Sequence, residues 1–131
     1  MTWFILSLLF AAEPSALSKA LVGTWTSQDK DAKIDMYPCG QFFCGRIVWL
    51  KEPKTDENNP NLKLRSRPVL QLEILTHLRF DRPDHWEDGS IYDPKTGNTY
   101  HCAATLRSNA KLELRGFVGM PLFGRTAVWT R

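Results

Sequence analysis

The chain has 131 residues, of which 43% are hydrophobic and 24% are charged. This composition predicts one globular domain with its own core and argues against disorder. Seventeen basic and fourteen acidic residues give a formal net charge of +3, which is too small to indicate a polyanionic partner such as nucleic acid. Five tryptophans are many for this length and indicate either a core packed with rings or a pocket lined by them.

The N-terminal segment resembles an export signal. The apolar run over residues 4–12 is too short to span a bilayer but has the length of a signal-peptide core. Ala16-Leu17-Ser18 fits the pattern of small residues that precedes cleavage, here before Lys19. We therefore expect a signal peptide over residues 1–18, a mature domain over residues 19–131 in the periplasm or the medium, and no stable membrane span. No lysine or arginine precedes the apolar run, so a buried N-terminal segment is the alternative.

Beyond Lys19 the sequence is typical of an all-β domain, because short alternating apolar and polar runs are separated by turn residues. The eight predicted strands are Leu21–Ser27, Ala32–Tyr37, Phe43–Lys51, Val69–His77, His85–Tyr92, Asn98–Arg107, Lys111–Val118 and Leu122–Arg131. Eight consecutive strands with short connections predict an antiparallel up-and-down barrel or a sandwich.

The first predicted hairpin places Cys39 and Cys44 close together. In an oxidising compartment this near pair forms a disulfide, which closes a short loop and contributes about 2 kcal/mol. Placing the two cysteines opposite each other aligns apolar residues on the other face, Met36 with Ile47 and Ile34 with Trp49. A zinc site is the rival interpretation, but a single C-x4-C with scattered histidines has the wrong ligand spacing. We therefore predict a disulfide and no metal site.

The second predicted hairpin joins Asn98–Arg107 to Lys111–Val118. Pairing Leu106 with Leu112 places Cys102 opposite Gly116 on a face that is apolar throughout. We therefore expect Cys102 to point inward as an unpaired and inert thiol.

One long connection, from Glu52 to Pro68, interrupts this pattern. Irregular segments of this length in a compact domain are usually functional or mobile, and a barrel needs one only as a lid or plug. The connection contains the basic residues Lys63, Arg65 and Arg67, which suit a carboxylate or phosphate. Exposed basic residues are, however, more often simply solvated.

Several stretches resemble DUF2147, a family of small exported bacterial proteins, mostly Gram-negative, with a lipocalin-like barrel. They include Gly23-Thr24-Trp25, Tyr37-Pro38-Cys39-Gly40, Cys44-Gly45-Arg46-Ile47-Val48-Trp49-Leu50, Asp56-Glu57-Asn58-Asn59-Pro60, Arg65-Ser66-Arg67-Pro68, Ile91-Tyr92-Asp93-Pro94, Arg115-Gly116-Phe117-Val118-Gly119 and Trp129-Thr130-Arg131. The chain departs from the family where Gln71, His77 and Asp88 occupy positions that are commonly glycine.

The resemblance implies a way of closing one barrel end. Lipocalin-like barrels share a Gly-x-Trp on the first strand, with an arginine from the last strand lying over the indole. In this chain the residues are Gly23, Trp25 and either Arg125 or Arg131. Such cation–π stacking contributes roughly 0.5–2 kcal/mol, and we interpret it as structural.

The barrel interior allows two interpretations. Trp49, Tyr100, Leu114 and Val118 are expected to face inward, where side chains either fill the space or line a cavity for an apolar ligand. Trp86, at a strand entry, either gates the mouth or packs on its neighbours. The candidate ligand-binding residues are Trp49, Arg65, Arg67, Trp86, Tyr92 and Tyr100.

No catalytic motif is recognisable, so we predict a binding protein without catalytic residues or cofactor. The leading hypothesis is a carrier or sensor of a small hydrophobic ligand, closed by the Glu52–Pro68 connection. The alternative is a protein-binding or inhibitor module of the cell envelope that uses the same connection. An undetected hydrolase and a nucleic-acid-binding barrel are weaker hypotheses, the latter because the aromatic residues alternate inward.

Overall fold

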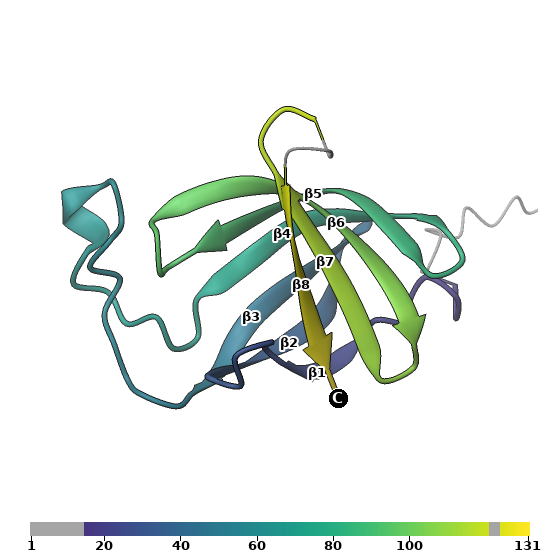
Figure 1. The fold of residues 1–131 in the computed structure, drawn as a ribbon, viewed down its shortest axis with the longest axis horizontal. Helices are drawn as coiled ribbons and strands as arrows, with labels where there is room; N and C mark the ends of the chain where they lie inside the picture. The colour runs from purple at the N-terminus through teal and green to yellow at the C-terminus, as the bar shows by residue number, and fades with distance from the viewer. Residues whose placement is uncertain (1–14, 121–123) are drawn as a thin grey trace, which may run out of the picture.

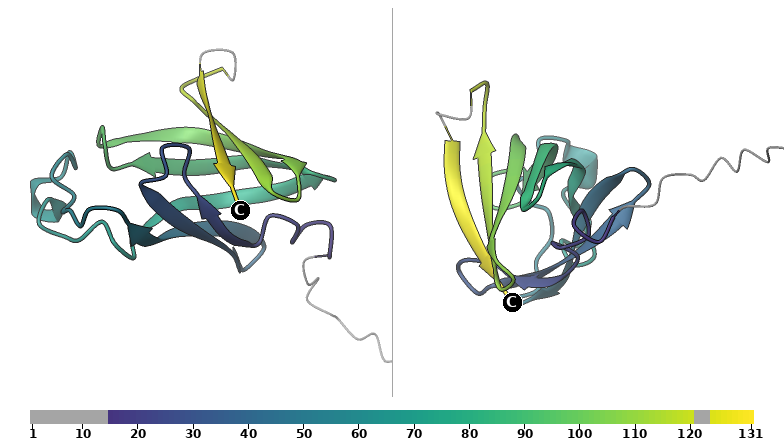
Figure 2. Two further views of the ribbon diagram at one scale, coloured as in Figure 1. Left: turned by 60° about the horizontal axis from the view of Figure 1, so that its bottom comes forward. Right: turned by 90° about the vertical axis from the view of Figure 1, so that its right-hand side faces the viewer.

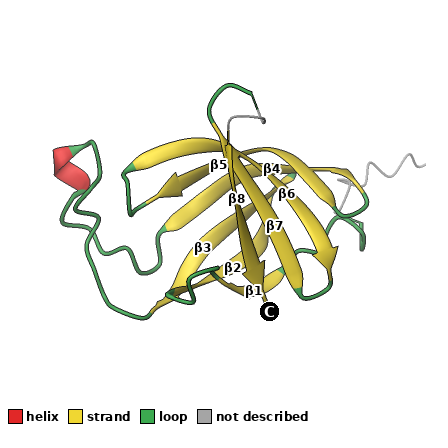
Figure 3. Cartoon of the chain, in the orientation of Figure 1, coloured by secondary structure: helices red, strands yellow, loops and turns green. Residues whose placement is uncertain are grey.

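The computed structural model describes residues 15–120 and 124–131. The strands are β1 (Gly23–Thr26), β2 (Ala32–Cys39), β3 (Phe42–Leu50), β4 (Glu73–Arg82), β5 (His85–Asp93), β6 (Asn98–Ser108), β7 (Lys111–Phe117) and β8 (Gly124–Thr130). They form a closed antiparallel barrel in sequence order, with one short 3₁₀ helix, η1 (Leu62–Leu64), in the long connection (Figures 1 and 3). The predicted fold class is confirmed. Within the described residues no helix is long and apolar enough to cross a bilayer.

The barrel closes through a weak seam between its first and last strands. β1 and β8 share a single residue pair, Thr26 with Thr130, whereas β7 and β8 pair along their whole length. Beside this pair, the Gln28 side chain accepts a hydrogen bond from the Val128 amide at 2.8 Å. A side chain therefore replaces one of the backbone contacts that the ladder lacks.

The first hairpin contains the predicted disulfide but not the predicted register. Cys39 and Cys44 are bonded, with 5.9 Å between their Cα atoms. Met36 pairs with Gly45, so the strands are displaced by two residues from the predicted alignment. The cysteines are thus diagonal neighbours rather than opposite each other, which a disulfide can still bridge.

Trp49 was predicted to face inward, and that prediction is wrong. A β-bulge shifts the register next to Lys33 and Ile34, where Ile34 pairs with Ile47 and Lys33 pairs with Trp49. The bulge inserts one residue into β3 and so reverses the direction of the side chains after it. As a result, Trp49 is 42% exposed and lies beside the Lys33 ammonium, 5.6 Å from the ring centroid.

The later strands agree more closely with the predictions. In the second hairpin Leu106 pairs with Leu112 and Cys102 with Gly116, as expected. β4 begins at Glu73, four residues after the predicted start at Val69, because Leu72 donates to the Val69 carbonyl in a turn. The last predicted strand began at Leu122, which lies outside the described residues, as does the apolar run over residues 4–12.

The barrel has two different ends. The N-terminal segment and the β2–β3, β4–β5 and β6–β7 turns lie at one end, where large apolar side chains fill the interior. These fully buried side chains include Leu21, Trp25, Met36, Phe43, Leu78 and Trp86. The other end carries the β1–β2, β5–β6 and β7–β8 turns and the long β3–β4 connection, and the β7–β8 hairpin extends beyond its neighbours (Figure 2). We call these the closed end and the open end.

Candidate functional site

The open half of the barrel contains a cavity of about 1020 Å³. This volume is at the upper limit of the roughly 300–1,000 Å³ that small-molecule sites occupy. Apolar side chains from strands all round the barrel form its wall and floor, among them Ile34, Ile47, Ile74, Ile91, Leu114 and Trp129. The interior is therefore filled at the closed end and hollow at the open end, so each of the two interpretations holds for one half.

Small side chains on β6, β7 and β8 create the hollow. Along this wall, Leu106, Leu112 and Trp129 are cross-strand neighbours near the closed end. Toward the open end the next inward row contains Ala104, Leu114 and Ala127, and the row after it contains Cys102, Gly116 and Arg125. Gly116 lines the cavity, and a Cβ added there would make only ordinary van der Waals contact, 3.8 Å from the nearest atom.

Cys102 lines this cavity as a free and buried thiol. Burial raises the pKa of Cys102 to about 12, so the thiol is protonated and unreactive at neutral pH. This agrees with the inert inward-facing cysteine predicted for this position.

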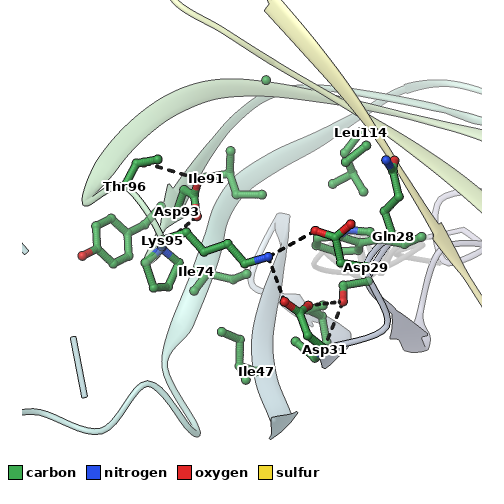
Figure 4. A pocket seen from close by; sticks show the side chains of 18 of the residues that line it. Gln28, Asp29, Asp31, Ile47, Ile74, Ile91, Asp93, Lys95, Thr96 and Leu114 are labelled. Atoms are coloured by element: carbon green, nitrogen blue, oxygen red, sulfur yellow. Dashed lines mark hydrogen bonds and ion pairs between the residues drawn. The ribbon is translucent and has the colours of Figure 1, made fainter. Parts of the chain in front are cut away.

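An ion-pair cluster spans the mouth of the cavity. The Lys95 ammonium, from the β5–β6 turn, lies 2.8 Å from an Asp31 carboxylate oxygen and 3.2 Å from one of Asp29 (Figure 4). Both aspartates belong to the β1–β2 turn, which is four strands away and thus on the opposite side of the eight-stranded barrel. We call this contact the Lys95 strap.

The strap is electrostatically favourable to both partners. The hydrogen bond from Lys95 lowers the pKa of Asp31, and the hydrogen bond to Asp31 raises the pKa of Lys95. Ser27 also donates to Asp31 at 2.8 Å and accepts from the Ala32 amide, which fixes the aspartate within its own turn.

The long connection lies beside the mouth and not across it. It extends past the β5–β6 turn, away from the barrel (Figure 1), and only its first residues, Glu52, Pro53 and Lys54, line the cavity among those described. The connection therefore does not form the lid that was predicted from the sequence.

A buried carboxylate fixes the connection in this position. Asp56 is 0% exposed and accepts hydrogen bonds from Tyr92 at 2.5 Å, Arg67 at 2.9 Å and Asn59 at 2.9 Å. Burial raises the pKa of Asp56, but these three donors outweigh that effect and hold it below its usual value. Asn58 donates to the Pro94 and Lys95 carbonyls, which ties the connection to the β5–β6 turn.

The candidate ligand-binding residues fall into two groups. Tyr92 and Tyr100 line the cavity, and Tyr92 also holds Asp56. Trp49, Arg65, Arg67 and Trp86 do not line it. Arg67 pairs with Asp56, and Arg65 donates to the Asn59 carbonyl at 2.7 Å, so these two arginines stabilise the connection internally. Leu114 lines the cavity as expected, whereas Val118 is at its rim and 67% exposed.

Trp86, expected at the mouth, lies instead at the closed end. It is 0% exposed, and its indole N–H donates to the Ser18 carbonyl at 3.0 Å. The turn that precedes β5 belongs to the closed end, which explains the placement. The N-terminal segment thus packs into the fold at Ser18.

Arg131, and not Arg125, covers the first-strand tryptophan. Its guanidinium carbon lies 4.1 Å from the centroid of the Trp25 ring. It also donates to the Val22 carbonyl at 2.9 Å and the Ala20 carbonyl at 3.0 Å. Arg125, the other candidate for this position, lines the cavity instead. The sequence analysis did not predict that location.

A small cluster of metal-type ligands, Asp81, His85 and Glu87, lies outside the cavity at the closed end. His85 lies between the Thr105 hydroxyl at 3.0 Å and the Glu87 carboxylate at 2.6 Å. Arg82 already pairs with Asp81 at 2.6 Å. The side chains of this cluster are therefore already paired within the protein.

An eight-stranded antiparallel barrel with an apolar cavity at one end and an arginine over a tryptophan at the other is a lipocalin-like barrel. Protein HP1028 from the human pathogen Helicobacter pylori, described as belonging to the lipocalin family, has a similar fold, with a TM-score of 0.78 and 24% identity over 85% of this chain and 82% of that one. A redesigned β-barrel matches with a TM-score of 0.53 and 16% identity over 92% of this chain and 98% of that one.

The sequence comparison is more specific. The family model DUF2147, described as an uncharacterized protein conserved in bacteria, matches residues 23–131, and the chain belongs to this family. No curated protein matches the chain. The family description assigns no activity. The cavity is therefore the feature of this chain that bears on its function.

Proposed function

We propose that this protein is a binding protein rather than an enzyme, and that it holds a small, largely apolar ligand in the open half of the barrel. The supporting observation is the cavity itself, whose wall is apolar while its mouth is charged. Pockets of this kind bind by burying apolar surface, and their few polar groups orient the ligand. The similar fold of a lipocalin-family protein supports the same function.

Gly116 offers a direct test of the cavity. Because Gly116 lines the cavity and has room for a Cβ, a Gly116→Leu substitution should extend a side chain into the hollow. Ala103→Leu is the matched control, because Ala103 lies on the same hairpin and pairs with Arg115 on the outer face. The readout is titration with the neutral apolar dye N-phenyl-1-naphthylamine, followed by dye fluorescence and by quenching of the tryptophans.

We expect the wild type and Ala103→Leu to bind the dye alike, and Gly116→Leu to bind it at least about tenfold more weakly at unchanged stability, a difference of about 1.4 kcal/mol. Equal binding by all three proteins would place the dye outside the cavity and contradict the proposal. A wild type that binds no apolar probe would contradict it as well.

We also propose that the protein is exported. The Cys39–Cys44 disulfide supports this, because such bonds persist in oxidising compartments. We further infer that the mature chain retains Ser18, since its carbonyl accepts the Trp86 indole N–H. Cleavage before Lys19 would leave this buried donor without that acceptor, at a cost of about 1–3 kcal/mol. The intact mass of the protein recovered from a periplasmic extract tests both statements.

A second candidate function, protein binding through the long connection, has one supporting observation. Leu62 is 72% exposed at the outer end of this connection, which the Asp56 hydrogen bonds hold in place. A partner that buries this leucine would gain about 1.5–3 kcal/mol from the hydrophobic effect. Leu62→Ser would weaken such binding and leave binding of the dye unchanged, so the two functions are separable by experiment.

A further inference from the structure

Arg125 lines the cavity near its mouth, where its side chain is exposed. Along β8 the alternating residues Ala127 and Trp129 line the cavity, and Trp129 is buried, so Arg125 lies on the same inward face. The intervening Thr126 also lines the cavity, but its hydroxyl already accepts a hydrogen bond from Arg115 at 3.0 Å. Arg125 is thus a cation at the exposed rim of the cavity, and the next inward row toward the closed end, with Ala127 and Leu114, is apolar.

The position of Arg125 along the barrel is equally specific. It pairs with Gly116, which in turn pairs with Cys102, and the next row toward the closed end is apolar. Because Gly116 has no side chain, no side chain lies between Arg125 and Cys102 in this inward row. The arginine therefore lies where the apolar wall ends and the charged mouth begins.

Arg125 has no carboxylate within ion-pair distance among the described residues. Other arginines of the chain are engaged: Arg67 with Asp56, Arg79 with Asp88, and Arg107 with Glu113. At the mouth, Lys95 is already held by two aspartates. Lys51 and Lys54 also line the cavity without a printed ion pair among the described residues, but both follow β3 at the mouth, whereas Arg125 lies within a strand, in the inward row of β8.

From this placement we infer that the natural ligand is an acidic amphiphile, a molecule with one carboxylate-type head group and an aliphatic body. The head group accepts hydrogen bonds from the Arg125 guanidinium, whose fork matches a carboxylate. The body lies against Leu114 and Trp129 toward the floor of the cavity. This inference rests on the proposed function and adds to it the chemical class of the ligand.

Three amphiphiles with unbranched chains of nine or ten carbons and different head groups test this inference: decanoate, 1-decanol and decyltrimethylammonium. Each is titrated against the full chain below its micellar concentration, by displacement of the neutral dye and by calorimetry. The variants are Arg125→Gln, which removes the charge, and Arg125→Lys, which keeps it without the fork. Lys63→Gln is the control, because it removes one positive charge from an exposed residue outside the cavity.

We expect the wild type to bind decanoate about tenfold more tightly than 1-decanol, and decyltrimethylammonium most weakly. Arg125→Gln should reduce this preference to about twofold or less while leaving the affinity for 1-decanol unchanged. Arg125→Lys should retain part of the preference, and Lys63→Gln all of it. Salt should weaken binding of decanoate more than that of 1-decanol.

The possible failures are distinguishable. Equal binding of decanoate and 1-decanol, or an equal loss of both in Arg125→Gln, would overturn the acidic head group and leave apolar binding intact. Tightest binding of decyltrimethylammonium would also overturn it. If none of the probes binds and the dye does not bind either, the proposed function fails together with this inference.

Discussion

The closed and open ends of the barrel are built from the same strands but serve opposite purposes. On β6, β7 and β8 the inward residues near the closed end are Leu106, Leu112 and Trp129, whereas toward the open end they include Cys102 and Gly116. Large residues exclude water and hold the strands together, and small residues leave space for another molecule. The gradient of side-chain size along each strand thus separates stability from binding.

The closed end is also satisfied by its own hydrogen bonds. The indole N–H groups of Trp25 and Trp86 donate to the Leu21 and Ser18 carbonyls, and Arg131 binds the backbone beside them. Polar groups at the open end, such as Lys95, are joined across the mouth, while Arg125 remains available. The comparison predicts that substitutions at the closed end alter stability and that those at the open end alter ligand binding.

The largest expected effect concerns a buried tryptophan of the closed end. Trp86→Ala should lower the free energy of unfolding by about 3–5 kcal/mol, because it leaves a large cavity in a packed region. Trp49→Ala is the control, since this indole is on the outer surface, and it should cost about 1 kcal/mol or less. Urea denaturation followed by circular dichroism measures both. Similar losses in the two variants would contradict the division between the ends.

A smaller effect is expected for the Lys95 strap. Lys95→Ala should accelerate exchange of the bound dye by up to about fivefold, because an exposed ion pair contributes up to about 1 kcal/mol. Stopped-flow fluorescence at pH 7 measures the rate. Lys54→Ala is the control, because Lys54 also lines the mouth but pairs with no carboxylate among the described residues. Unchanged exchange in Lys95→Ala would show that the strap does not limit access.

The pH dependence of the strap follows from its two shifted groups. The pKa of Asp31 lies below its usual 3.8, so its contribution is present above that pH and is lost as the pH falls through the lowered value. The pKa of Lys95 lies above its usual 10.5, so its contribution is present below that pH and is lost as the pH rises through the raised value. Faster exchange of the wild type at both extremes, but not of Lys95→Ala, is the expected pattern.

The smallest effect concerns the backbone rather than either end. Gln71 has a φ of 71°, a conformation that glycine adopts without strain. Gln71→Gly should therefore raise the free energy of unfolding by about 0.5–1 kcal/mol, despite the greater freedom of the unfolded chain. Gln41→Gly, at an exposed turn residue outside the positive-φ set, should lower it. If Gln71→Gly does not raise the free energy of unfolding, the inferred strain at residue 71 is contradicted.

Sequence reasoning predicted the barrel well because alternation and turn residues are local signals. The second hairpin was registered correctly, since its loop is short and its inward face is uniformly apolar. Three positions where the family resemblance predicted glycine were also informative. Gln71, His77 and Asp88 all have positive φ values, of 71°, 58° and 63°. Each of these residues holds a backbone conformation that glycine adopts more easily.

The site was harder to predict because it depends on features that have no local signal. The bulge that turns Trp49 outward adds one residue to β3, and alternation alone does not locate it. Arg67 looked like a solvated or anion-binding residue, because its partner Asp56 is eleven positions away in an irregular segment. Whether Arg125 or Arg131 covers Trp25 depends on the register of β8, which the sequence left open.

The single Thr26–Thr130 pair between β1 and β8 has a kinetic consequence. Cooperative units with few backbone hydrogen bonds open at the lowest free energy, so amide protons along this junction should exchange with solvent well before those of the β6–β7 ladder. Transient parting of the first and last strands would widen the barrel laterally. A bulky ligand would then have a second route into the cavity, through the side wall of the barrel and not between the turns at the mouth.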